Sequence, residues 1–161
     1  MANVTAEWDV KTKDGIKYEI AILNFEKKIQ SFKVGQELCS KTFKIEGLKF
    51  QIMVYPAGVN EKAKNHVGIY LKNLGKLTLD LHWACRILVK DGIKFIDSKH
   101  SLAGGACEGK DHCVSHVDCH SRKDGVLSPD GSLLLESKIL IKSITNVGTA
   151  EGSMILDLIT S

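Results

Sequence analysis

The chain contains few prolines, no strong excess of one charge and no long run of apolar residues. Two of its 161 residues are proline, and the absence of a long polar tract argues against extended disorder. No stretch of about 18 apolar residues is present that would span a membrane as a helix. The opening "MANVTAEWDV" lacks the apolar segment of a secretory signal peptide. These absences predict a cytoplasmic protein with no membrane association.

The charge balance argues against nucleic acid as a partner. The 22 Lys and Arg residues nearly offset the 19 Asp and Glu residues, which gives a formal net charge of +3. The lysines are scattered, and no basic helix or Arg-rich run is present. The chain also lacks G-x-S-x-G, a P-loop and G-x-G-x-x-G. We therefore expect no nucleic-acid binding, no cofactor and no enzymatic activity.

The cysteines are the most unusual feature of the composition. Their number, five, is odd, and the chain is too large to need disulfides for stability. Without an export signal, we expect reduced thiols. Three of the five lie in residues 107–120, "CEGKDHCVSHVDCH", together with three of the six histidines. This segment raises the question of a metal site.

The spacing within 107–120 argues against one zinc site that uses all three histidines. His112, His116 and His120 are four residues apart. On a strand this spacing corresponds to about 13 Å, which Zn–N bonds of about 2 Å cannot bridge. A site in the flanking loop, with Cys107, Cys119 and His120, stays open. The sequence predicts no metal.

Most of the chain alternates between apolar and polar residues, which is typical of strands. We expect strands at 18–25, 41–47, 48–58, 66–74, 77–89, 93–97 and 132–144. Asp-Gly, which favours tight hairpin turns, occurs four times. Residues 60–66 predict a short helical turn, and the Gly-rich segment 102–111 predicts a loop. Many strands with short turns indicate a β-sandwich or barrel.

The segment "SKTFKIEGLKFQIMVYPAG" (40–58) resembles the meprin-and-TRAF-homology (MATH) family. "HVGIYL" (66–71), "LHWACRILVKDG" (81–92) and "LSPDGSLLLESKILI" (127–141) are similar to the strands that follow in that family. The resemblance covers about 18–144. It leaves an N-terminal flank, 1–17, and a C-terminal tail, 145–161, in which "MILDLIT" suggests an extra strand. The family usually begins with Trp where this chain has Ile20.

The resemblance implies an all-β, eight-stranded antiparallel TRAF-like β-sandwich. It also implies an adaptor or substrate-recognition role, in which a short extended peptide of a partner protein adds a strand in a shallow groove. Family groove positions fall on His66, Trp83, His112 and Val114. Alternation places His112, Val114 and His116 on one face of a strand at 112–117, and Cys113, Ser115 and Val117 on the other. The family pattern places Val117 nearer the core and does not follow this strict alternation throughout. A bulge in the strand would reconcile the two.

Several alternatives stay open. Trp83 lies on an apolar face and is either core or groove, and His66 is either a groove residue or a solvated strand-edge histidine. The chain is either a peptide-binding module or a structural, self-associating β-sandwich protein that has lost the groove, so homo-oligomerisation is also open. The tail is expected to pair with "EWDV" near the N-terminus or to lie at a self-association interface, because an exposed apolar strand would be prone to aggregation.

Overall fold

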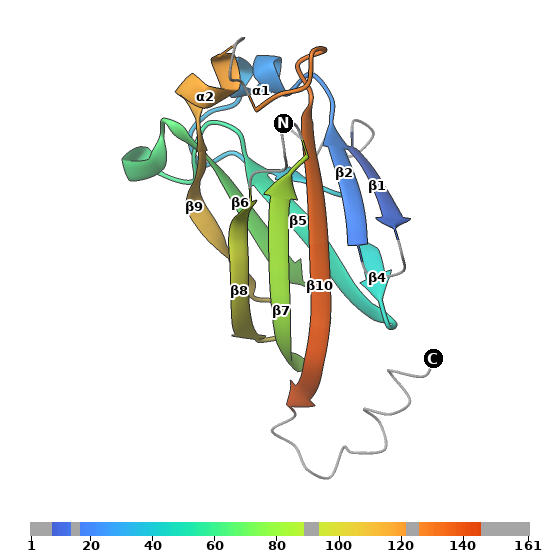
Figure 1. The fold of residues 1–161 in the computed structure, drawn as a ribbon. Helices are drawn as coiled ribbons and strands as arrows, with labels where there is room; N and C mark the ends of the chain where they lie inside the picture. The colour runs from blue at the N-terminus through green and yellow to red at the C-terminus, as the bar shows by residue number, and fades with distance from the viewer. Residues whose placement is uncertain (1–7, 14–16, 89–93, 122–125, 146–161) are drawn as a thin grey trace.

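Two antiparallel sheets face each other across one hydrophobic core (Figure 1). The computed structural model describes residues 8–13, 17–88, 94–121 and 126–145. Side chains from both sheets join in a single cluster that includes Ile20, Phe50 and Leu81. The prediction of an antiparallel TRAF-like β-sandwich is confirmed.

Sheet A has five strands in the order β1-β2-β10-β7-β8. These are β1 (Trp8–Lys13), β2 (Lys17–Ile22), β10 (Leu133–Thr145), β7 (Thr78–Ile87) and β8 (Lys94–Leu102). Sheet B has the order β3-β5-β6-β9, and a further short strand, β4, pairs with β5. Its strands are β3 (Leu38–Cys39), β4 (Phe43–Ile45), β5 (Leu48–Tyr55), β6 (His66–Asn73) and β9 (Cys107–Ser115). Strand β9 therefore forms one edge of sheet B.

The described residues contain ten strands instead of eight. One reason is that part of the expected N-terminal flank forms β1, which pairs with β2 along its whole length. The other is that 38–45 divides into two short strands, β3 and β4, which both pair with β5. The expected loop at 102–111 is wrong in its second half, because β9 begins at Cys107. Residues 103–106 form the turn between β8 and β9, in which the Ala106 N–H donates to the Ala103 carbonyl at 3.0 Å.

Two helices lie side by side at one end of the sandwich (Figure 1). Helix α1 (Phe25–Ser31) follows β2, and α2 (His116–His120) follows β9. Ser115 caps α2, because its side chain accepts a hydrogen bond from the Asp118 N–H. Alternation alone extended the strand to 117. The cap instead ends it at Ser115.

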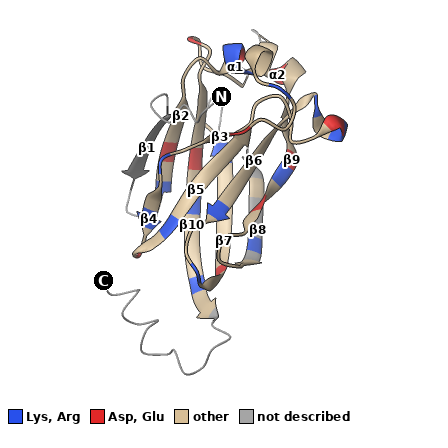
Figure 2. Cartoon of the chain, turned by 180° about the vertical axis from the view of Figure 1, so that it is seen from behind, with Lys and Arg blue, Asp and Glu red and all other residues tan. Residues whose placement is uncertain are grey.

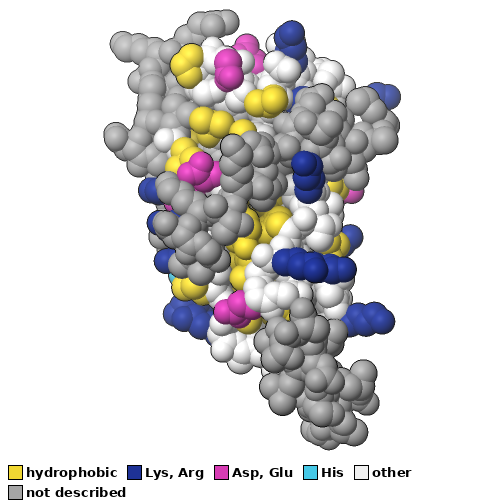
Figure 3. Space-filling view, turned by 90° about the vertical axis from the view of Figure 1, so that its right-hand side faces the viewer, with side chains coloured by type: hydrophobic (Ala, Val, Ile, Leu, Met, Phe, Trp, Pro, Cys, Tyr) yellow, Lys and Arg dark blue, Asp and Glu magenta, His cyan; other side chains and the backbone are white. Residues whose placement is uncertain are grey.

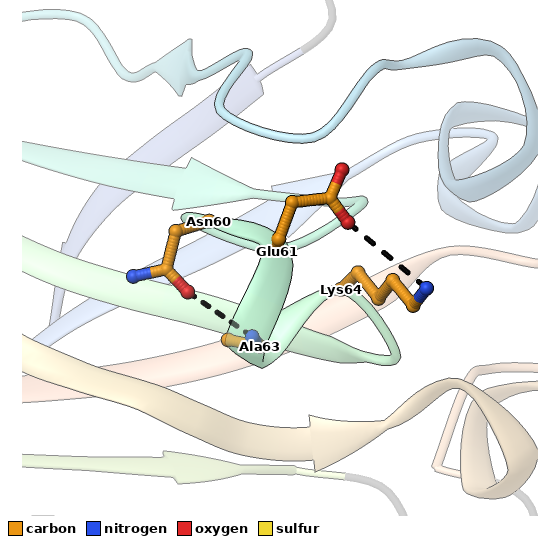
Figure 4. A network of polar contacts seen from close by, with 4 residues as sticks. All are labelled: Asn60, Glu61, Ala63 and Lys64. Carbon is orange, nitrogen blue, oxygen red and sulfur yellow. Dashed lines mark hydrogen bonds and ion pairs between the residues drawn. The ribbon is translucent and has the colours of Figure 1, made fainter.

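The predicted helical turn at 60–66 is confirmed as the 3₁₀ turn η2 (Glu61–Ala63). Asn60 Oδ1 accepts the Ala63 N–H at 3.1 Å, and Lys64 pairs with Glu61 at 4.0 Å (Figure 4). Gly58, with φ of 103°, lets the chain pass this turn closely, because a Cβ there would lie 2.4 Å from the Ala63 carbonyl oxygen. The turn delivers the chain directly into β6 at His66.

Hydrophobic side chains also show between lysine and arginine side chains on the side of the molecule that carries β1 and β2 (Figure 3). The tail beyond Thr145, including the expected strand at 154–160, lies outside the described residues. Of its expected partner "EWDV", Trp8, Asp9 and Val10 belong to β1 and pair with β2.

Candidate functional site

Strand β9 pairs with β6 on one side and carries an irregularity in its middle. The register runs from Lys72↔Cys107 to Ile69↔Lys110, then shifts, and resumes at Val67↔Val114. Residues 111–113 therefore lie opposite the single residue Gly68, which is a bulge of the kind found at sheet edges. A bulge at this place changes the alternation that the sequence implied for 112–117. Regular pairing is confined to 107–110 and to the end of the strand.

His66 and His112 come together on the outer face of sheet B. Their ring centroids lie 4.5 Å apart, with an interplanar angle of 63°. His66 opens β6 and is half-buried, whereas His112 lies in the bulge and is exposed. The two imidazoles form one polar corner beside the edge strand.

Trp83 is not part of this surface, and its assignment to a groove is wrong. It lies on β7 in sheet A with 0% of its surface exposed, and its Nε1 donates to Ser137 Oγ at 2.7 Å. The physical reason is the alternation of β7, which places Trp83 on the same face as Leu81 and Cys85 between the sheets.

Val114 is also a core residue, contrary to its expected place in the groove. It is 7% exposed and lies directly opposite Val67, which is fully buried. Facing residues of an antiparallel pair share a side of the sheet. The bulge at 111–113 resets the alternation, so Val114 points inward while His112 points out.

His116 leaves the strand and belongs to α2. Its N–H donates to the Asn65 carbonyl at 2.9 Å, and its ring Nε2 lies 2.7 Å from the Pro56 carbonyl oxygen. Burial, followed by the nearby His120 and His66, lowers the pKa of His116, although the Pro56 contact opposes this. The ring thus joins α2 to the β5–β6 connection. Val117, expected to face inward, is 79% exposed because α2 replaces the strand.

Two tyrosines that the sequence analysis did not single out form the centre of the outer face. Tyr55 on β5 and Tyr70 on β6 meet edge to face, with ring centroids 5.7 Å apart. The Tyr70 hydroxyl donates to Asp111, and the Tyr55 hydroxyl donates to Glu37 Oε2 at 3.0 Å. Burial, and then the hydrogen bond to Glu37, raises the pKa of Tyr55. For Tyr70 the sequence did contain a signal, because this residue lies on the same face of its strand as His66.

Gly109 allows the Tyr70 ring to lie against β9. A Cβ at Gly109 would lie 2.1 Å from the Ile69 carbonyl oxygen and 2.8 Å from Tyr70 Cγ. The edge strand therefore carries no side chain where the ring crosses it. We call the four side chains Tyr55, Tyr70, His66 and His112 the tyrosine–histidine surface. Lysine and acidic residues are interspersed along the strands around it (Figure 2).

The cysteines and histidines of 107–120 do not converge. All five cysteines of the chain are free. Cys107 is exposed on β9 with its Sγ 3.6 Å from Met53 Sδ, whereas Cys119 is buried in α2. Across the described residues, no three Cys, His, Asp or Glu side chains lie close enough together to hold a metal ion. A loop site built from Cys107, Cys119 and His120 has no geometric support.

None of the helices in the described part of the chain is long and apolar enough to cross a membrane.

Comparisons with known proteins agree with the architecture. The family profile described as "MATH domain" matches residues 17–122. Among solved structures, TRAF5 from Notothenia coriiceps is similar, with a TM-score of 0.62 and 15% identity over 81% of this chain and 76% of that one. No curated protein matches the sequence. MATH domains are generally protein-interaction modules. With the profile covering residues 17–122 and the sandwich as described, the chain belongs to the MATH domain family.

Proposed function

We propose that this chain binds a short extended peptide of a partner protein by adding it as a strand to the free edge of β9. It would act as an adaptor or substrate-recognition module in the cytoplasm. The observation that carries the proposal is the position of β9, which is an edge strand next to the tyrosine–histidine surface. An edge strand presents unpaired backbone N–H and C=O groups, which are a template for another strand.

The regular part of β9 is the best docking segment. Residues 107–110 keep an unbroken register with β6, whereas 111–113 are bulged and His116 is helical. A strand at 112–117 that forms one wall of the groove predicts that the peptide pairs along 112–116, but there it would meet irregular backbone. We therefore place its main-chain hydrogen bonds at 107–110.

The tyrosine–histidine surface supplies the contacts for side chains. An added strand directs alternate side chains toward one face of the sheet, where Tyr70 and Tyr55 offer aromatic area. His66 and His112 lie at one end of this surface and suit a polar or acidic residue of the peptide. Lys72 lies on the same face of β6 as Tyr70 and is positioned to add positive charge.

The competing function is a self-associating sandwich without a peptide groove. The bulge in β9 favours it, because edge bulges also protect strands from pairing. The two functions differ in whether a foreign peptide pairs with β9 at all.

The test is a screen of the purified full chain against a random peptide library, followed by titration of the selected peptide. We expect binding to be lost when alternate peptide amides are N-methylated, since a methyl group removes the main-chain donors. His112→Ala should weaken binding. Lys99→Ala, an exposed lysine on β8, the edge strand of the other sheet, is the matched control and should not. Failure to select any peptide would refute the proposal. So would binding that survives N-methylation of each of the two alternate sets of peptide amides.

A further inference from the structure

An apolar pocket opens at the end of the sandwich opposite α1 and α2. Its volume is about 420 Å³. Four leucines and two lysines contribute to its walls, namely Leu48, Leu74, Leu77, Leu79, Lys49 and Lys76. It lies at the end of β6 opposite to the histidines of the tyrosine–histidine surface. The proposed peptide site therefore does not account for it.

The walls of the pocket are held in place by Asn73. This residue is 1% exposed, and its Nδ2 donates to the carbonyls of Leu77, at 2.8 Å, and Leu102, at 3.1 Å. Its Oδ1 accepts the Gly75 N–H at 2.9 Å. The Leu74 N–H also donates to the Lys49 carbonyl at 3.0 Å, which ties the two walls together. The pocket is thus preformed, so an occupant would not have to order it.

Strand β10 ends beside this pocket. Ile144 lies opposite Leu79, a wall residue, and Thr145 lies opposite Thr78. The chain therefore leaves the described structure next to the pocket mouth. Sixteen residues follow, in which the polar stretch 146–153, "NVGTAEGS", precedes the apolar stretch 154–160, "MILDLIT".

We propose that residues 154–160 of the same chain fill this pocket. The eight residues of 146–153 span at most about 28 Å when extended, which is ample for a segment that starts at the pocket mouth. In an extended conformation Met154, Leu156 and Leu158 share one face and match the leucine walls. Asp157 then points the opposite way, toward the mouth that carries Lys49 and Lys76.

Residues 1–7, which are also outside the described residues, are too far away to reach this pocket. Strand β1 begins at Trp8, opposite Ile22, which in turn pairs with Leu133 at the start of β10. The 13 residues of β10 separate that end of the sandwich from the pocket by about 40 Å. Residues 1–7 span at most about 25 Å. The C-terminal segment is therefore the part of the chain that fits by position, length and composition.

The test uses the full chain with methyl-labelled leucines, observed by NMR. The double variant Leu156→Asp, Leu158→Asp should shift the methyl signals of Leu74 and Leu77. Signals of Leu133 and Leu135, at the far end of β10, should stay unchanged. Thr149→Asp, which adds a charge in the spacer without removing an apolar side chain, is the control and should shift neither set. Unchanged signals for Leu74 and Leu77 in the double variant would overturn the proposal.

A second measurement separates docking within one chain from docking between two copies. The full chain should sediment as the same species with or without the double substitution, and the Leu77 signal should not depend on protein concentration. A concentration-dependent signal would assign the pocket to the tail of a second copy and refute the intramolecular contact. Leu77→Ala and Leu158→Ala should also couple, so that together they lower the urea midpoint less than the sum of their separate effects. Strict additivity would contradict the contact.

Discussion

The indole Nε1 of Trp83 donates a 2.7 Å hydrogen bond to Oγ of Ser137, a contact that links β7 to β10 inside the core. Both residues are fully buried. The indole N–H is the only hydrogen-bond donor of the side chain and has no access to water. The hydroxyl oxygen of Ser137 accepts this one hydrogen bond. This bond allows the largest side chain of the core to lie between the sheets.

Trp83→Ala should destabilise the fold by about 3–5 kcal/mol, since it removes a large buried side chain. Ser137→Ala should cost about 1–3 kcal/mol, because it leaves the buried indole N–H without its partner. Urea unfolding followed by tryptophan fluorescence measures the second variant, and far-UV circular dichroism measures the first. Trp83→Ala with wild-type stability would show that this side chain is not part of the core.

Gly109→Ala should destabilise the protein or displace Tyr70, because the added Cβ would collide with the Ile69 carbonyl and the tyrosine ring. Gly68→Ala on the adjacent strand β6 is a matched control. A Cβ there would lie 3.5 Å from its nearest neighbour, the Lys110 carbonyl oxygen, which is ordinary contact. We expect a clear drop in thermal midpoint for the first variant and little change for the second. Equal effects would contradict the close packing of Tyr70 on Gly109.

The five thiols should differ widely in reactivity. Cys107 is exposed, whereas Cys85 is 1% exposed and burial raises its pKa. Since the thiolate is the reactive form, Cys107 should react first with a disulfide reagent and Cys85 last, after unfolding. Mass spectrometry of partially labelled protein identifies the sites. Cys107→Ser should remove the fast phase, and its persistence in that variant would show that another thiol is accessible.

Alkaline pH should destabilise the protein through the same thiols. Burial raises the pKa of Cys39 to about 11 and of Cys113 and Cys119 to about 12, against 9.0 for a free thiol. Above pH 9 the unfolded chain therefore loses protons that the folded chain keeps, so the free energy of unfolding falls as pH rises. Cys119→Ala should make this fall less steep than in the wild type. An unchanged slope would mean that Cys119 is not buried.

Mild acid should also destabilise the fold, through His116. Its pKa is lowered in the folded state, mainly by burial. Above about pH 6.5 the ring is neutral in both states. As pH falls below this value, the unfolded state takes up the proton first, so stability declines until the folded ring titrates as well. His116→Gln should reduce this decline. The measurement is the urea midpoint of each protein at pH 7.5 and at pH 5. An equal drop in wild type and variant would rule out the contribution of His116.

Periodicity was sufficient to predict the strands, because alternation reports directly on which strand face is buried. The strand at 77–89, with Leu79, Leu81, Trp83 and Cys85 on one face, illustrates this. Periodicity left a sandwich or a barrel open, and the resemblance to the MATH family selected the sandwich. The resemblance placed Val114 in the groove and Val117 toward the core, and both assignments are wrong, because a bulge and a Ser115 cap change the face of the later residues. Neither feature has a signal in the apolar–polar pattern. Tyr55 and Tyr70 were missed because each is ordinary alone, and only the pairing of β5 with β6 brings them together.

The central claim is that a peptide adds to β9 along 107–110. The most direct measurement is backbone hydrogen exchange of the full chain, with and without a saturating peptide selected from a library. We predict slower exchange for those amides within 107–110 that face away from β6, with no change in β8 at the edge of the other sheet. Protection confined to β8, to β1 or to the α1–α2 end, with 107–110 unaffected, would contradict the account.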